Sequence, residues 1–220
     1  MRIDAVIKVG GSLSVGGGLE GLMVAIGRLS RHFRILIIPG GGAFADLVRD
    51  HDRRYHLRGT TAHKMAILAM DQYGYLLLDL SKEGRPAWSL QGVKEILRSG
   101  KLPILPPSRL LLRYDPFEPS WDVTSDAIAA YIAGLVGAKT LVLLKDVDGI
   151  FERDPRSDPQ TALLPQVRRA ELKQYGGVDL AFPRVLGGVR SCWIINGRYP
   201  ERLEELLQEG KTKGTVILSS

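Results

Sequence analysis

The stretch Ala5-Val6-Ile7-Lys8-Val9-Gly10-Gly11-Ser12 decides the fold, because a short apolar run opens directly into glycines beside a lysine. Such a run predicts a buried strand, and glycines after it let main-chain N–H groups approach an anion. The run Ile35-Leu36-Ile37-Ile38 repeats this pattern, followed by Pro39-Gly40-Gly41-Gly42 and a predicted helix from Ala43. The two loops together indicate two phosphate groups facing each other, although glycine after a strand is first of all a turn residue.

Further motifs follow in order along the chain. Thr124-Ser125-Asp126 opens a predicted helix, and Asp146-Val147-Asp148-Gly149-Ile150-Phe151 follows a predicted strand and leads to Asp154-Pro155. Neither glycine loop is a P-loop or a dinucleotide-binding G-x-G-x-x-G. The segment from Asp146 to Pro165 is not an EF-hand, because Ile150 occupies a ligand position; a surface excursion with Asp-Gly and Asp-Pro turns has the same composition.

Strands and helices are predicted to alternate. Strands are expected at residues 5–9, 35–38, 102–105, 140–144, 192–195 and, as a final edge strand, 215–218; helices are expected at 19–29, from 43, and at 60–80, 90–99, from 124, 179–186 and from 200. Near-continuous apolar strands between helices predict an α/β fold, a three-layer αβα sandwich with a mainly parallel open sheet. Ligands are then expected at the carboxyl ends of the strands, where both glycine loops lie.

Composition favours one compact domain over residues 1–220, since 220 residues with 45% hydrophobic side chains can bury one substantial core. The single cysteine, Cys192, cannot form an internal disulfide, which fits a reducing cytoplasm. The sequence shows neither a membrane-span pattern nor a signal-peptide pattern, so we expect no membrane association. The net charge of +6 does not indicate nucleic-acid binding, because Arg53-Arg54 and Arg168-Arg169 are not interleaved with aromatics; a positive field would also attract small phosphorylated molecules.

The ordered motifs resemble those of the amino acid kinase family over nearly the whole chain. The resemblance implies the amino acid kinase fold, ATP and Mg²⁺ as cofactors, Mg²⁺ held mainly through ATP phosphates rather than by protein ligands, a small-molecule phosphate monoester as partner, and a homo-oligomer. It implies catalytic roles for Lys8, Asp126 and Arg184, where Arg184 stands in place of a lysine found in many members. It also implies ATP or phosphate binding by Gly10, Gly11, Ser12, Thr124, Lys145, Asp146, Asp148, Gly149, Phe151, Asp154 and Pro155.

A closer resemblance is to the family members that act in methanofuran biosynthesis. It is based on His63-Lys64-Met65-Ala66, Met70-Asp71, Pro107-Ser108, Ser120-Trp121 and Asn196-Gly197-Arg198 with Pro200-Glu201-Arg202. It implies conversion of an aminomethylfuran phosphate to its diphosphate. The expected acceptor site consists of Gly40, Gly41, Gly42, His63, Lys64, Trp121, Asn196 and Arg198, with Asp71 or Asp122 facing the aminomethyl cation.

A phosphate acceptor is already nucleophilic at neutral pH, so no general base is needed and Asp126 is expected to orient Lys8. Each residue also has an ordinary interpretation: Asp126 as a first-turn carboxylate, Thr124 as an N-cap, and Trp121 as a core residue. Among alternative enzymes, an isopentenyl phosphate kinase would have a histidine after the glycine loop, where Ala43-Phe44-Ala45-Asp46 stands; a uridylate kinase stays open. A nucleotide-binding regulatory or storage protein is the alternative outside enzymes, against which Lys8 and Asp126 argue.

Overall fold

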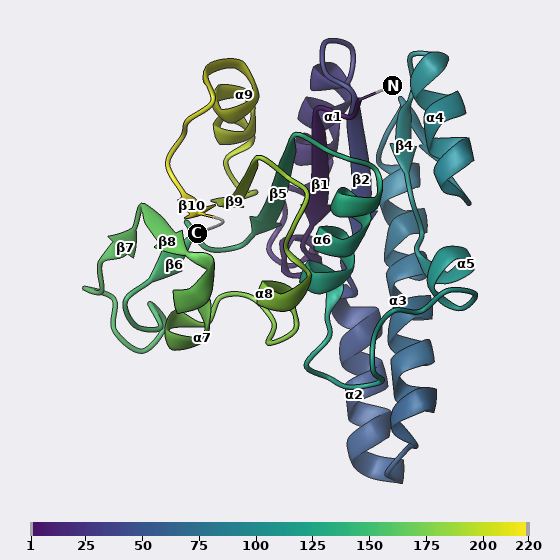
Figure 1. Ribbon diagram of the computed structural model, residues 1–220, viewed down its shortest axis with the longest axis vertical. Coiled ribbons are helices and arrows are strands. Elements are labelled where there is room, and N and C mark those ends of the chain that lie inside the picture. Colours follow the sequence, from purple (N-terminus) through teal and green to yellow (C-terminus); the bar gives the residue numbers. More distant parts are fainter. Residues whose placement is uncertain (1, 219–220) are drawn as a thin grey trace.

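An eight-stranded sheet forms the centre of the computed structural model, which describes residues 2–218 (Figure 1). The strand order is β3-β4-β2-β1-β5-β9-β10-β8, and every neighbouring pair is parallel except β9 and β10. The strands are β1 (Ala5–Val9), β2 (Ile35–Pro39), β3 (Gly84–Pro86), β4 (Leu102–Ile104), β5 (Thr140–Lys145), β8 (Gln166–Arg168), β9 (Ser191–Asn196) and β10 (Thr215–Leu218).

Helices connect the strands. They are α1 (Leu19–Leu29), α2 (Gly42–Tyr55), α3 (Gly59–Asp79), α4 (Leu90–Arg98), α5 (Ser108–Leu111), α6 (Ser125–Leu135), α7 (Leu172–Tyr175), α8 (Phe182–Val185) and α9 (Pro200–Glu209), with short 3₁₀ turns η1 (Gly11–Ser14) and η2 (Arg169–Glu171). Among residues 2–218, no helix is both long and apolar enough to cross a bilayer.

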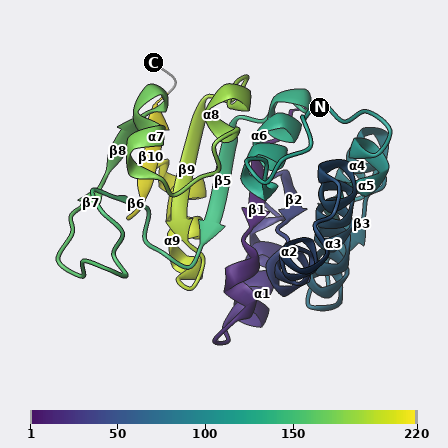
Figure 2. The ribbon, with the colours of Figure 1, turned by 90° about the horizontal axis from the view of Figure 1, so that it is seen from below.

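Alternate residues of the buried strands supply two apolar clusters, one on each face of the sheet. Val6 and Leu143 face α6 and α8, whereas Ile7 and Val142 face α1 and α9. Figure 2 shows α6, α7 and α8 on one side of the sheet and α1 and α9 on the other. Because parallel strands covered on both faces must be apolar throughout, the sequence carries continuous apolar runs there. The predicted three-layer α/β architecture is confirmed.

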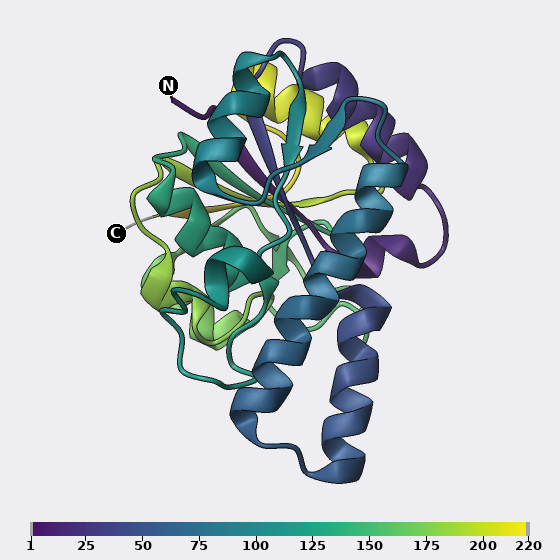
Figure 3. The ribbon, with the colours of Figure 1, turned by 90° about the vertical axis from the view of Figure 1, so that its right-hand side faces the viewer.

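The α2–α3 hairpin extends well beyond the carboxyl ends of the strands (Figure 3). Helix α3 joins this projection to the core. Its residues Tyr73 and Leu77 belong to the apolar cluster on the α1 and α9 face of the sheet, whereas Ile67 and Met70 belong to the cluster on the α6 and α8 face. The hairpin therefore forms a wall beside the strand ends where ligands were expected.

Several predicted elements differ from the structure. The final strand β10 is interior, because β8 pairs with its outer side, so the prediction of an edge strand at 215–218 was wrong. The helix expected over 179–186 is only α8, because the Asp179 carboxylate accepts the Phe182 N–H and so precedes the helix. The segment 146–165 is not all loop: it contains the hairpin of β6 (Ile150–Phe151) and β7 (Leu163–Leu164). Strands β3 and β8 and helix α5 were missed, since each has only three or four residues.

Candidate active site

The two glycine loops contact each other where β1 and β2 end. Val9 is paired with Pro39 in register, so the loops leave adjacent strands at the same level. A Cβ atom at Gly11 would collide with the backbone of Gly42, and one at Gly40 would lie 2.7 Å from the Gly11 nitrogen. Only glycine permits this approach, which brings main-chain amides of both loops to one place.

A side chain of α3 and the backbone of β5 fix the glycine loop that follows β1. The Tyr73 hydroxyl donates to the Gly10 carbonyl at 3.1 Å, and the Gly10 N–H donates to the Leu144 carbonyl of β5 at 3.0 Å. Tyr73 is almost completely buried, so this bond is shielded from water. The loop after β1 is therefore fixed both to the neighbouring strand and to the α2–α3 hairpin.

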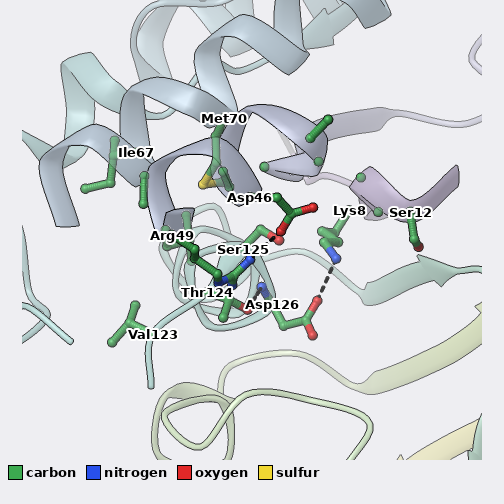
Figure 4. Close-up of a pocket in the computed structure, with 18 of the residues that line it drawn as sticks. Lys8, Ser12, Asp46, Arg49, Ile67, Met70, Val123, Thr124, Ser125 and Asp126 are labelled. Atoms are coloured by element: carbon green, nitrogen blue, oxygen red, sulfur yellow. Dashed lines mark hydrogen bonds and ion pairs between the residues drawn. The ribbon is translucent and has the colours of Figure 1, made fainter. Parts of the chain in front are cut away.

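Three charged side chains meet beside the loops. The Asp126 carboxylate contacts Lys8 Nζ at 2.9 Å through Oδ1 and Lys145 Nζ at 2.6 Å through Oδ2. Lys8 and Asp126 are only 6% and 3% exposed, so water does little to solvate these charges. Figure 4 shows Lys8 and Asp126 pointing toward one another across the edge of the cavity. Two lysines paired with one carboxylate leave a net positive charge of one beside the glycine amides.

The ionisation of this triad depends on burial and pairing. Burial raises the pKa of Asp126, but Lys145 and Lys8 outweigh that effect and keep its pKa well below the ordinary value. Burial also lowers the pKa of Lys8, and the Asp126 charge opposes the shift. Asp126 is thus a carboxylate at neutral pH, and it cannot act as a proton acceptor for a substrate hydroxyl.

The first turn of α6 positions Asp126. Thr124 is the N-cap, and its hydroxyl accepts weakly from the Asp126 N–H at 3.4 Å. That hydroxyl also donates to Asp179 at 2.7 Å, and the N–H groups of Thr124 and Ala127 donate to the same carboxylate oxygen. The ordinary interpretation of Thr124 as an N-cap is therefore correct, and it places Asp126 toward Lys8.

A cavity of about 360 Å³ opens over this cluster. Figure 4 shows Lys8, Ser12 and Asp126 at one end and Arg49, Ile67 and Met70 at the other. Among the nominated residues the cavity is lined by Lys8, Gly10, Gly11, Ser12, Gly41, Gly42, His63, Trp121, Thr124, Asp126, Lys145 and Asp146. At the Ser12 end, the Ser12 hydroxyl donates to Asp146 at 2.9 Å, which links the β1 loop to the loop after β5.

Aromatic and charged side chains of α2 and of the loop before α6 line the other end. The Arg49 guanidinium lies 4.8 Å above the Trp121 ring and pairs with Asp46 at 2.8 Å. The Trp121 indole N–H donates to Asp52 at 2.7 Å, which fixes the plane of the ring. This end offers a cation, a carboxylate and a flat apolar surface.

Helix α3 contributes His63 and its partner. His63 Nε2 lies 2.8 Å from the Asp115 carboxylate, and the imidazole is nearly buried. Lys64 is exposed on α3 and does not line the cavity, because it lies about 100° around the helix from His63. The two neighbours in sequence are thus in different environments.

Other nominated residues are also outside the cavity. Asn196 donates to Asp148 at 3.0 Å, and Arg198 donates to the Val15 carbonyl at 2.8 Å, so neither faces the Trp121 end. Asp148 also pairs with Arg202 and Lys213, and Gly149 packs against Thr215. Arg184 is exposed on α8. Gly40 packs against the Gly11 backbone, and the Asp71 carboxylate accepts a hydrogen bond from Ser108. Asp122 is exposed. The remaining nominated residues outside the cavity belong to the segment 146–165; they are Phe151, Asp154 and Pro155.

Sequence reasoning missed Arg49 and Asp46, which lie on the first two turns of α2. Their spacing of three residues on a predicted helix places them on one face, and that face continues from the second glycine loop. This signal was present in the sequence. Within residues 2–218, no group of three or more His, Cys, Asp or Glu side chains is arranged to hold a metal ion.

Comparison with known proteins places this arrangement in a family. The sequence model described as Amino acid kinase family matches residues 5–196, and the chain belongs to that family. Among curated relatives, the [5-(aminomethyl)furan-3-yl]methyl phosphate kinase of Methanocaldococcus jannaschii is 33% identical over 209 residues, which cover 94% of this chain and 93% of the relative.

Solved structures share the fold. The uridylate kinase from Archaeoglobus fulgidus superposes with a TM-score of 0.77 at 19% identity, covering 98% of this chain and 100% of that one. The isopentenyl phosphate kinase of T. acidophilum gives a TM-score of 0.68, also at 19% identity, covering 98% of this chain and 100% of that chain. These structural similarities confirm the predicted fold. At 19% sequence identity they are evidence for the fold only.

Proposed function

We propose that the protein is an ATP-dependent kinase that converts a phosphate monoester to a diphosphate, with [5-(aminomethyl)furan-3-yl]methyl phosphate as the acceptor. The observation that carries the proposal is the Lys8–Asp126–Lys145 triad, with Lys8 and Asp126 buried, beside two touching glycine loops. The choice of acceptor is supported by the relative from Methanocaldococcus jannaschii, which covers nearly the whole chain.

The reaction needs positive charge more than it needs a base. An oxygen of the acceptor phosphate forms a bond to the γ-phosphorus of ATP while the bond from that phosphorus to the bridging oxygen of ADP breaks. The acceptor is largely dianionic at pH 7, because the second pKa of a phosphate monoester is about 6. Lys8, Lys145 and the loop amides reduce the repulsion between the two polyanions and hold them in line. Asp126 orients both lysines and takes no proton.

Mg²⁺ fits this site as part of the nucleotide. Both oxygens of Asp126 contact lysines, so this carboxylate is not a free metal ligand. The ion would be held mainly through ATP phosphate oxygens and would supply charge neutralisation at the transferring group.

The two ends of the cavity divide the substrates in this proposal. Lys145 and the amides of the β1 loop take the ATP phosphates, and Ser12, Thr124 and Asp146 line the same end of the cavity. The segment from Asp148 through Gly149, Phe151, Asp154 and Pro155 takes the nucleoside. Gly41 and Gly42 take the acceptor phosphate, and Gly40 permits the close approach of the two loops. Arg184 reaches the transferring group from α8 on nucleotide binding. The proposal includes one domain over residues 1–220, a homo-oligomer and a cytoplasmic location.

The furan ring is assigned to the end with Trp121. Trp121 and the Arg49 guanidinium form a flat surface, while Met70 and Ile67 line the same cavity with apolar side chains. Asp46 replaces Asp71 and Asp122 as the partner of the aminomethyl cation, because Asp46 lines the cavity and the other two carboxylates do not. An apolar prenyl phosphate would offer no cation to Asp46 and no flat ring to Trp121.

A competition assay tests the acceptor. The aminomethylfuran phosphate, UMP and isopentenyl phosphate compete for limiting enzyme with ATP, and the products are separated by chromatography. We expect the furan to have the highest kcat/KM, and Trp121→Ala to reduce that preference roughly tenfold through loss of the stacking surface. Trp88→Ala is the matched control, since Trp88 also lies under an arginine, Arg109, but outside the cavity. A preference for UMP or isopentenyl phosphate would overturn the acceptor assignment.

A further inference from the structure

The Asp179 carboxylate lies between the starts of two helices and binds both. Its Oδ2 accepts from the Thr124 N–H at 3.0 Å, the Thr124 hydroxyl at 2.7 Å and the Ala127 N–H at 2.9 Å. Its Oδ1 accepts from the Phe182 N–H at 2.7 Å. One side chain therefore caps α6 through one oxygen and α8 through the other.

Each of the four groups that contact Asp179 donates a hydrogen bond, so the side chain at this position must supply two acceptor oxygens. Only an ionised carboxylate offers both, because a carboxylic acid or an amide turns one position into a donor. Burial raises the pKa of Asp179, and the hydrogen bonds from Thr124 and Ala127 oppose that shift. Asp179 is half-buried, and leaving any of its four donors without an acceptor would be costly.

Both helices lead to residues of the proposed reaction. On α6, Asp126 follows Thr124 by two residues and holds Lys8 and Lys145. On α8, Phe182 is completely buried against the sheet, and Arg184 follows two residues later with its N–H on the Ala181 carbonyl at 3.0 Å. The Ala181 N–H donates in turn to the Asp122 carbonyl at 3.1 Å, next to the loop that carries Trp121. Movement of Asp179 would therefore shift residues on two sides of the triad.

We infer that Asp179 is a positioning residue that couples α8 to the Lys8–Asp126–Lys145 triad through the first turn of α6. It touches no reacting atom and acts by holding Asp126, and with it both lysines, in the geometry for transfer. The inference rests on the proposed function, because its kinetic test uses the kinase reaction. Its structural consequence can be measured without that reaction.

Two substitutions separate the two halves of the contact. Asp179→Asn keeps one oxygen, which satisfies the three donors of α6 when it faces them, and leaves the amide group against the Phe182 N–H. Asp179→Ala removes all four bonds. Asp4→Ala is the control: Asp4 is a half-buried carboxylate that also accepts two hydrogen bonds, from Lys139 and the Arg34 N–H, but it precedes β1 at the amino ends of the strands.

Steady-state kinetics well below the unfolding temperature give the first readout. We expect kcat to fall about a hundredfold in Asp179→Ala and about tenfold in Asp179→Asn, with KM for ATP and acceptor changed less than about threefold. Asp4→Ala should lower the unfolding temperature without lowering kcat. If Asp179→Ala keeps kcat within about threefold of the wild type, the positioning role is wrong.

Amide hydrogen exchange gives the second readout and does not depend on activity. Asp179→Asn should increase exchange in the peptide containing α8 and leave the start of α6 protected, whereas Asp179→Ala should expose both. Unchanged exchange in both variants would overturn the coupling even if kcat fell. Absence of turnover in the wild type, together with the expected exchange pattern, would reject the proposed function and leave the coupling intact.

Discussion

At the scale of single residues, the site is explained by where charge is buried. Lys8 is placed under the loops by its position in β1, since it shares a face with Val6 and so points toward α6. A buried ammonium is costly unless it is paired, and Asp126 supplies the partner from the first helical turn. Lys145, on the same face of β5, brings a second cation to the same carboxylate.

Removal of the Lys8 ammonium should affect the chemical step more than binding. In Lys8→Ala, Asp126 keeps its contact with Lys145, so the fold should be retained. We expect kcat to fall about a hundredfold or more with little change in ATP affinity, because the charge is needed most in the transition state. Lys64→Ala, at an exposed position outside the cavity, should leave kcat unchanged. Kinetics and ATP titration check both, and equal turnover in Lys8→Ala would remove Lys8 from the mechanism.

Among the nominated residues, those on regular elements beside the glycine loops lie at the cavity, while their roles stay a prediction. Lys8, Asp126 and Lys145 were nominated through the family resemblance, and the structure brings them together because strand ends and a helix start converge at one edge of a parallel sheet. Lys64 and Asn196 could not be placed, because tertiary contacts decide which face of a helix meets the cavity and where the end of a strand directs its side chains. Arg49 was missed although its spacing from Asp46 was readable.

At the scale of elements, the glycine loops determine how closely β1 and β2 can present their amides. The φ angle of Gly11 lies outside the left-handed region, so its backbone conformation would tolerate a side chain. What excludes a side chain at Gly11 is a collision with the neighbouring loop. The second loop enters α2 at Gly42, whose φ of 55° lies in the left-handed region that favours glycine.

Gly11→Ala should therefore be strongly destabilising. The new Cβ would collide with the Gly42 backbone, and separating the loops should cost about 3 kcal/mol of unfolding free energy. Gly21→Ala is the matched control, because Gly21 lies on α1 with open space around it and should gain roughly 0.5–1 kcal/mol. Urea denaturation of the two variants measures both changes, and a neutral Gly11→Ala would contradict the packing of the loops.

The ion cluster around Asp148 should make the acid stability of the protein depend on this residue. Burial raises the pKa of Asp148, but hydrogen bonds from Lys213, Arg202 and Asn196 outweigh it and bring the pKa to about 2. Because this folded-state pKa is below the ordinary 3.8, the contribution to stability is complete above the ordinary value and is lost as the pH falls through about 2.

Asp148→Asn should accordingly flatten the fall in unfolding free energy below pH 4, as measured by urea denaturation at a series of pH values. Asp50→Asn, at an exposed surface pair with Arg53, should leave that slope unchanged. A wild-type slope retained in Asp148→Asn would show that the cluster contributes nothing to acid stability.

The long elements were predictable and the short ones were not. Apolar periodicity is readable over α1 or β5, but β3 and β8 are three residues long and depend on pairing with β4 and β10. The position of β10 inside the sheet is equally non-local, because it depends on which segment covers its outer side. Local sequence carries no signal for that choice.

At the scale of the whole molecule, one sheet separates two apolar clusters. The proposed active site lies at the carboxyl ends of its strands. The α2–α3 hairpin projects from this end of the sheet (Figure 3). It contributes Arg49 and His63 to the cavity, while the β5 side contributes Lys145 and Asp146. The proposed acceptor end and the proposed nucleotide end of the cavity thus lie on opposite halves of one sheet. Transfer between two bound phosphates is the chemistry this arrangement favours.

The central claim is that the acceptor atom is a phosphate oxygen, and ³¹P NMR of the reaction tests it most directly. With ATP, Mg²⁺ and the aminomethylfuran phosphate, we predict that the monoester signal disappears and two coupled diphosphate signals appear as ADP accumulates. The dephosphorylated alcohol, used as the control acceptor, should give no product. Phosphorylation of that alcohol, or of a carboxylate, faster than formation of the diphosphate would contradict the account.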